Sequence, residues 1–155
     1  GEFMERDWGR STLAASDLLL RTDFPSWGYM VSRGATTIWE RWNGDTGDLA
    51  MNSFNHYALG AITAFLYRRV AGIDDAAPGF SAINARPLLD ARLGSGQASL
   101  QTAHGLIASA WAARGDGGMD YTLAVPAGCT AQVTLPDGRS QAVGPGAHRF
   151  ATAGR

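Results

Sequence analysis

One glutamate stands apart in the stretch GATTIWERWNGD, where Glu40 lies between Trp39 and Trp42. The other glutamates of the chain lie within its first five residues, which resemble vector-derived sequence. Indole rings stack well on the apolar faces of sugar rings, and a carboxylate beside them can activate water as a general base. Glu40 is therefore the first candidate for catalysis.

A structural role for the same carboxylate is the alternative. Arg33 and Arg41 lie close to Glu40 in sequence, and either could hold it in an ion pair while the tryptophans serve as ordinary core residues. Composition alone leaves both interpretations open.

His56 is the second polar side chain of interest, in the stretch SFNHYALG. Helical periodicity predicts a long helix over residues 52–70, with His56 in its first turn and directed away from the apolar face. An imidazole there can exchange hydrogen bonds with a sugar hydroxyl. Alternatively, it can simply bond a nearby carbonyl or carboxylate.

The elements that must position these residues change character near Pro78. Before it, apolar spacing predicts helices over residues 11–22, with Ser11 or Thr12 as N-cap, over 25–34, and over 52–70. After it, alternating runs bounded by glycine and proline predict six strands within 80–88, 97–103, 105–111, 119–126, 130–136 and 147–150. We expect a tag over 1–8, a helical segment over 9–77 and an antiparallel β-sandwich over 78–155.

Composition excludes several classes of function. The chain has 155 residues and a net charge of -1, and its basic residues are scattered arginines, which is atypical of nucleic-acid binding. One cysteine and three dispersed histidines suggest no disulfide, metal site or cofactor. No apolar run approaches the roughly 20 residues of a membrane span, and with no visible signal peptide we expect a cytoplasmic protein.

Four motifs in order, TDFPSWGYM, GATTIWERW, MNSFNHYALG and LYRRVAGI, resemble the α-L-rhamnosidases of glycoside hydrolase family 78. The following PGFSAINARP is similar to that family's passage from its catalytic barrel into its C-terminal sandwich. The resemblance extends from about Gly9 to Phe150. It implies an α+β fold, in which a few helices from the end of an (α/α)6 barrel precede an antiparallel β-sandwich.

The resemblance also implies a chemistry, the inverting hydrolysis of terminal α-L-rhamnosides. Glu40 matches the family's general base and His56 a residue that contacts the sugar, while Trp39, Trp42 and Asn55 would form or support the pocket wall. The family's general acid has no counterpart here, so we expect a C-terminal fragment that is inactive alone.

Two further expectations complete this interpretation. The alternative function is a non-catalytic carbohydrate-binding or assembly module. In addition, barrel helices without their neighbours would expose apolar faces, so we expect self-association.

Overall fold

The computed structural model describes residues 14–154. The chain divides between Ile62 and Thr63 into two compact units, named here the helical unit (described residues 14–62) and the sandwich unit (63–154). The tag-like residues 1–8 and the expected N-cap at Ser11 or Thr12 lie outside the described residues. The division of the chain at residues 77 and 78 stays a prediction.

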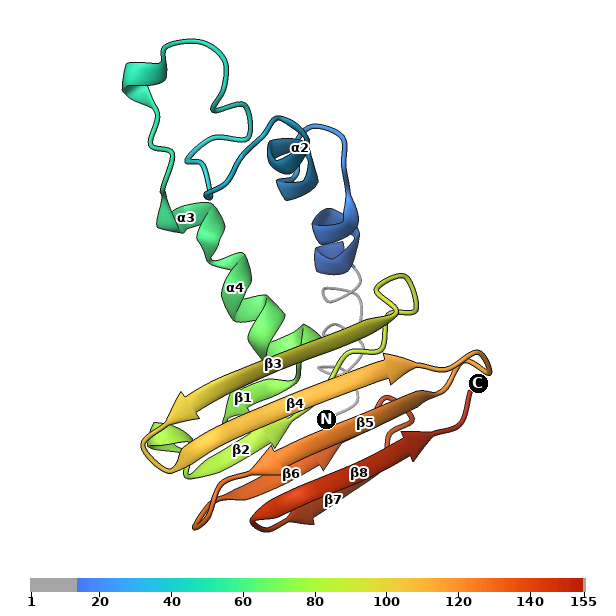
Figure 1. Cartoon of the computed structure of the whole chain (residues 1–155). Coiled ribbons are helices and arrows are strands. Elements are labelled where there is room, and N and C mark those ends of the chain that lie inside the picture. Colours follow the sequence, from blue (N-terminus) through green and yellow to red (C-terminus); the bar gives the residue numbers. More distant parts are fainter. Residues whose placement is uncertain (1–13, 155) are drawn as a thin grey trace. The chain divides into compact units, whose positions relative to one another are not determined.

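The helical unit contains short helices joined by a long loop (Figure 1). They are a helix over residues 14–20, α2 (Trp27–Ser32), η1 (Leu49–Met51) and α3 (Tyr57–Gly60). The α2 helix begins later than the expected residue 25, because the Ser26 side chain accepts a hydrogen bond from the Tyr29 N–H at 3.0 Å and acts as N-cap. Gly34, with φ of 87°, follows its end.

The expected long helix over 52–70 is wrong at its start. Helical structure begins at Tyr57 with His56 as N-cap, and continues through α4 (Ile62–Phe65) and a π-helical turn, η2 (Leu66–Val70). Phe54 therefore lies outside the helix, and Tyr57 in its first turn is 87% exposed. The reason is that backbone groups of Ser53 and His56 bond the segment around Ile38, so they cannot enter a helix.

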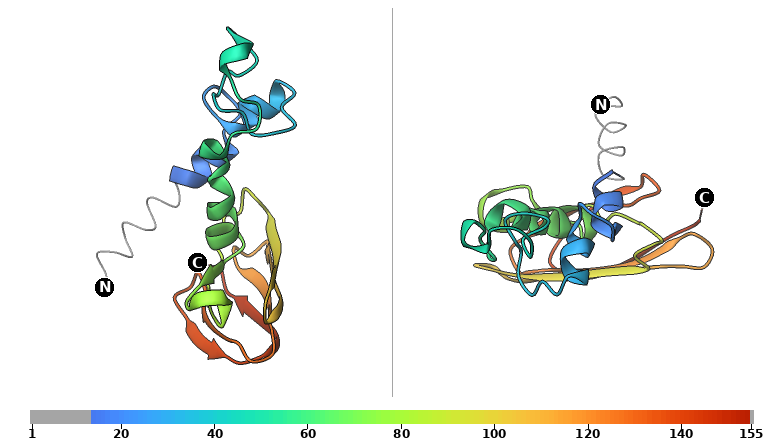
Figure 2. Two further views of the ribbon diagram at one scale, coloured as in Figure 1. Left: turned by 90° about the vertical axis from the view of Figure 1, so that its left-hand side faces the viewer. Right: turned by 90° about the horizontal axis from the view of Figure 1, so that it is seen from above.

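The sandwich unit consists of two four-stranded sheets that face each other in two layers (Figures 1 and 2). One sheet has the order β1 (Ile73–Asp75), β2 (Ala82–Ala85), β6 (Thr130–Thr134), β7 (Ser140–Val143). The other has the order β3 (Ser95–Thr102), β4 (Gly105–Ala113), β5 (Met119–Val125), β8 (Gly146–Thr152). A short 3-10 turn, η3 (Pro78–Phe80), lies between β1 and β2.

All six expected strands are confirmed, and the structure adds β1 and β7. Neighbouring strands pair antiparallel except β2 and β6, which pair in parallel with Ala82 opposite Thr130. Asp74 and Asp75 lie in the short edge strand β1, where Arg68 forms an ion pair with Asp74 at 3.1 Å. The fold class is thus the expected one, with a single parallel pair inside it.

Alternate residues of each central strand enter the core between the two sheets. In β5, Met119, Tyr121 and Leu123 are each at most 1% exposed. The sole cysteine, Cys129, is also fully buried there. This alternation fixes the register of the sandwich, because a shift by one residue would turn every apolar side chain outward.

Side chains of β4 anchor the end of the helical stretch within the sandwich unit. The indole N–H of Trp111 donates to the Val70 carbonyl oxygen at 2.7 Å, and Ser109 Oγ donates to the Ala71 carbonyl oxygen at 2.5 Å. These bonds satisfy carbonyl groups that a helix end leaves without intrahelical partners. Gly72 then turns the chain with φ of 76°, and a Cβ there would lie 2.4 Å from the Pro87 nitrogen. Only glycine fits this turn.

Candidate functional site

Two segments of the helical unit, residues 38–40 and 53–56, lie side by side through backbone hydrogen bonds. The Glu40 N–H donates to the Ser53 carbonyl oxygen at 2.8 Å, and the His56 N–H donates to the Ile38 carbonyl oxygen at 2.9 Å. The fold thereby places the segment that carries the candidate carboxylate beside the one that carries the candidate imidazole.

The Glu40 side chain is exposed and is held by a backbone donor. Its Oε2 accepts a hydrogen bond from the Ser53 N–H at 2.9 Å. Within residues 14–154 no ion pair reaches Glu40: Arg33 pairs with Asp45 at 2.6 Å, and the Arg41 Nε donates instead to an amide oxygen, at 3.3 Å. The alternative of a structural ion pair with Arg33 or Arg41 is therefore wrong.

His56 caps the helix that follows it. Its Nδ1 accepts a hydrogen bond from the Ala58 N–H at 3.2 Å, so a neutral ring carries its proton on Nε2. The imidazole also stacks on Tyr57, with ring centroids 5.2 Å apart and planes at 12°. The alternative interpretation gave His56 a carbonyl or carboxylate as partner, whereas Nδ1 bonds a backbone N–H. The Nε2 edge keeps its capacity to donate to a hydroxyl.

The tryptophans around Glu40 are packing residues in this unit. Trp39 is 5% exposed and meets Phe54 edge-on at 5.8 Å between centroids. Trp42 is half-buried and meets Trp27 edge-on at 5.0 Å. Asn55 is exposed, and its backbone N–H donates to Ser53 Oγ at 3.3 Å. Trp39 thus supports the segment of Glu40 from inside, while Trp42 and Asn55 keep accessible surface.

Sequence reasoning missed the partners that hold Glu40. Ser53 contributes a main-chain N–H, which every residue except proline possesses, so no residue pattern signals it. Asn52, 8% exposed, was expected at the start of a helix and instead bonds two loop segments with its side chain. The burial of this polar side chain is the feature that marks Asn52, and burial is visible only in the structure.

Two hollows of the described surface are lined by other residues. One of about 250 Å³ lies in the helical unit beside α2, between Trp27, Val31 and Ile38. The other, about 700 Å³, lies on the sheet that contains β3, β4, β5 and β8, and includes Ser99, Thr122 and Arg149 in its lining. Over the described residues no group of three His, Cys, Asp or Glu side chains could hold a metal ion. No helix in that range is long and apolar enough to cross a membrane.

Comparison with known proteins identifies both parts of the chain. Residues 8–70 match the bacterial α-L-rhamnosidase 6-hairpin glycosidase domain, and residues 72–149 match the bacterial α-L-rhamnosidase C-terminal domain. An α-L-rhamnosidase of Formosa agariphila is 37% identical over 131 residues, which are 81% of this chain and 14% of the relative. One of Streptomyces avermitilis is 38% identical over 135 residues, which are 84% of this chain and 13% of the relative.

Solved structures agree. The S. avermitilis α-L-rhamnosidase complexed with L-rhamnose superposes with a TM-score of 0.86 at 33% identity, covering 95% of this chain and 16% of that one. The Aspergillus terreus α-L-rhamnosidase gives a TM-score of 0.87 at 30% identity, with 95% and 18% covered. The chain thus spans about one seventh of the relatives' length, as the 14% and 13% coverages show. It belongs to the α-L-rhamnosidase family and corresponds to a C-terminal portion of those proteins.

Proposed function

We propose that this chain supplies the water-activating side of a site that hydrolyses terminal α-L-rhamnosides with inversion. Glu40 is the general base, and His56 donates from Nε2 to a hydroxyl of the sugar. Trp42 and Asn55 form pocket wall, and Trp39 supports it. The observation that carries the proposal is the Glu40 carboxylate itself. It is exposed, free of any ion pair among the described residues, and held by the Ser53 N–H at 2.9 Å.

This arrangement suits a base. One carboxylate oxygen is fixed by the backbone donor, which leaves the second oxygen to accept a proton from water. Inversion requires a second carboxyl group about 6.5–9.5 Å away, to protonate the leaving group.

The described residues near Glu40 offer no such acid. Asp45 pairs with Arg33, and Asp48 Oδ1 accepts from the Ala50 N–H at the start of η1. We propose that the acid belongs to a segment that this chain lacks, so we expect no turnover from this chain alone. Hydrolysis of p-nitrophenyl α-L-rhamnoside by the isolated chain, abolished by Glu40→Gln, would contradict the missing acid.

A chimera tests the role of Glu40. This chain replaces the segment of the S. avermitilis relative that it matches, and hydrolysis of the same rhamnoside is followed. Glu40→Gln should lower kcat by about 10²–10⁴-fold, the usual contribution of a general base. Azide needs no proton removed, so it should restore turnover to Glu40→Gln. Full activity of Glu40→Gln, or a loss that azide leaves unchanged, would refute the role.

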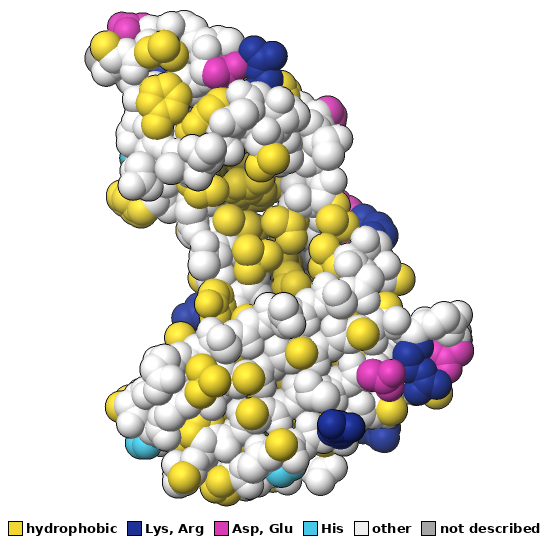
Figure 3. Space-filling model, viewed as in Figure 1, with side chains coloured by type: hydrophobic (Ala, Val, Ile, Leu, Met, Phe, Trp, Pro, Cys, Tyr) yellow, Lys and Arg dark blue, Asp and Glu magenta, His cyan; other side chains and the backbone are white. Residues whose placement is uncertain are grey.

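Self-association is a second proposal, carried by exposed apolar side chains of the helical unit. Val31 is 69% exposed, Leu49 53% and Phe24 52%. Figure 3 shows hydrophobic side chains gathered over this part of the chain, whereas on the sheet in view they lie as separate patches. We propose that these side chains are covered in a dimer, because exposed apolar patches usually mark interaction surfaces. Light scattering should give twice the monomer mass, and Val31→Asp should lower the measured mass towards that of the monomer. A monomer at all concentrations would exclude the dimer.

A further inference from the structure

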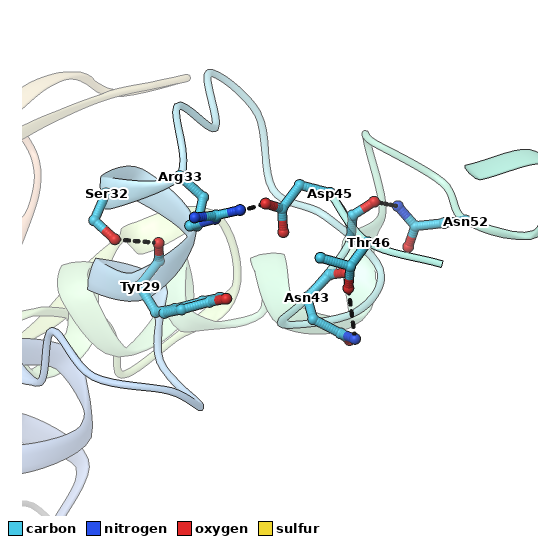
Figure 4. Close-up of polar contacts among 8 residues, drawn as sticks. Tyr29, Ser32, Arg33, Asn43, Asp45, Thr46 and Asn52 are labelled. Atoms are coloured by element: carbon cyan, nitrogen blue, oxygen red, sulfur yellow. Dashed lines mark hydrogen bonds and ion pairs between the residues drawn. The ribbon is translucent and has the colours of Figure 1, made fainter. Parts of the chain in front are cut away.

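Asn52 occupies the interior of the loop that joins Glu40 to Ser53. It is 8% exposed, its Nδ2 donates to the Gly44 carbonyl oxygen at 3.2 Å, and its Oδ1 accepts from the Arg41 Nε at 3.3 Å. Figure 4 shows the amide directed at the turn that carries Asn43, Asp45 and Thr46. A buried amide whose two ends are both bonded has one favourable orientation, so Asn52 fixes its own place in the loop.

The position of Asn52 determines where the donor to Glu40 points. The Ser53 N–H belongs to the peptide plane that follows the Asn52 Cα, and this plane is rigid. Its direction is therefore set by ψ of Asn52, which is 127°. A side chain that anchors Asn52 also aims the N–H that meets Glu40 Oε2 at 2.9 Å. The second anchor, Arg41, is the residue that follows Glu40 in the chain.

The turn on the other side of Asn52 is built to receive it. A Cβ on Gly44 would lie 2.7 Å from Asn52 Nδ2 and 3.0 Å from Trp39 Cε3, so the amide can approach only because this residue has no side chain. The ion pair of Arg33 with Asp45 at 2.6 Å holds the same turn (Figure 4). The acceptor of the Asn52 amide is thus fixed independently of Asn52.

We propose that Asn52 is a positioning residue, which aims the Ser53 N–H at Glu40 and so holds the carboxylate in the orientation needed to activate water. The catalytic half of this statement rests on the proposed role of Glu40. The geometric half concerns only the bond between Ser53 and Glu40, and it can be measured in the chain without any turnover.

The measurement is the proton chemical shift of the Ser53 amide in NMR spectra of the isotope-labelled chain. A donor to a carboxylate forms a charge-assisted bond, which moves its proton downfield. Glu40→Gln defines the upfield shift that accompanies loss of this charge. We expect Asn52→Ala to produce most of that shift, and Asn52→Ala combined with Glu40→Gln to add little to Glu40→Gln alone.

Two companion variants separate positioning from general loosening. Gly44→Ala should move the same signal in the same direction, because its Cβ displaces the Asn52 amide. Asn43→Ala is the matched control, since this exposed asparagine bonds Thr46 rather than Asn52 or Ser53, and it should leave the Ser53 signal unchanged. The indole N–H of Trp27, which donates to the Leu59 carbonyl oxygen at 3.1 Å, should keep its signal in every variant, which shows that the unit remains folded.

If Asn52→Ala unfolds the unit, Asn52→Asp decides instead, because it keeps the acceptor for Arg41 and replaces the donor to Gly44 with a carboxylate oxygen. A Ser53 shift that matches the unsubstituted chain in a folded Asn52 variant would overturn the proposal.

The chimera separates this failure from failure of the proposed function. With Glu40 as base, Asn52→Ala should lower kcat at least tenfold with little change in KM, and azide should restore part of the loss. Undiminished activity of Glu40→Gln would instead refute the role of the carboxylate, whatever the Ser53 signal shows.

Discussion

Removal of one hydroxyl, in Ser109→Ala, should destabilise the sandwich unit more than its size suggests. Ser109 is 2% exposed; its Oγ donates to the Ala71 carbonyl oxygen at 2.5 Å and lies 3.2 Å from the Tyr121 hydroxyl oxygen. Ala71 and Tyr121 are 3% and 1% exposed, so water cannot replace the lost partner. The substitution therefore leaves two buried polar groups unsatisfied.

The magnitude follows from those two groups. A buried polar group left without a partner costs about 1–3 kcal/mol, so the two groups orphaned by Ser109→Ala should lower the free energy of unfolding by about 2–6 kcal/mol. Tyr121→Phe removes the Tyr121 hydroxyl but keeps the bond from Ser109 to the Ala71 carbonyl oxygen, so it should cost about 1 kcal/mol. In the double variant the Ala71 carbonyl alone is unsatisfied, so its loss of stability should fall short of the sum of the single losses by about 2–4 kcal/mol.

Urea unfolding followed by circular dichroism in the β-sheet region measures these differences. Ser99→Ala is the matched control, because that side chain is exposed on the neighbouring strand β3, and its effect should stay within about 0.5 kcal/mol. A Ser109→Ala loss no larger than the control, or additive losses in the double variant, would refute the argument that buried orphan groups determine the cost.

Three further predictions concern the sandwich unit. Burial raises the pKa of Tyr121 to about 12, so the hydroxyl stays protonated to higher pH in the folded state than in the unfolded chain. The contribution of this group to stability should be complete below about pH 10 and fall by up to about 2–3 kcal/mol towards pH 12. Unfolding measured as a function of pH should show no such loss in Tyr121→Phe. Gly72→Ala should cost more than about 2 kcal/mol in thermal unfolding, since its Cβ meets Pro87 and its φ is 76°, whereas Gly115→Ala, with open space around its Cβ, should be tolerated. Hydrogen bonds from Arg92 lower the pKa of Asp90, so the contribution of its carboxylate to stability is present above about pH 4 and is lost as the pH falls through the lowered pKa. In Asp90→Asn the stability should depend less on pH in that acid range. An unchanged pH dependence would contradict this.

The strands were predictable because their signal is local. Runs such as 105–111 and 119–126 alternate in polarity and end at glycines or proline, and β4 and β5 fall there. β1 and β7 were missed because each is short: β1 has three residues, two of them aspartates, and β7 exposes three of its four side chains. The parallel pairing of β2 with β6 joins segments far apart in sequence, which local periodicity cannot reveal.

Part of the candidate site was likewise predictable from the sequence, and part was not. Composition singled out Glu40, and the family motifs singled out His56, because both side chains differ from their surroundings. The helix start was misjudged because the spacing of Phe54 is compatible with the apolar face of a helix, while backbone bonds from Ser53 and His56 to residues 38–40 keep residues 52–55 outside the helix. Tertiary hydrogen bonds overrode local propensity there, and the same bonds created the Ser53 donor.

The fully buried thiol of Cys129 can report the stability of the sandwich unit directly. A thiol-reactive dye can attach only when the sandwich unit opens, so the labelling rate reports the free energy of that opening under native conditions. Since this is the single cysteine of the sequence, melting of the helical unit alone would leave the dye unreacted. One reaction can thus tell loss of the sandwich from loss of the helices without any substitution.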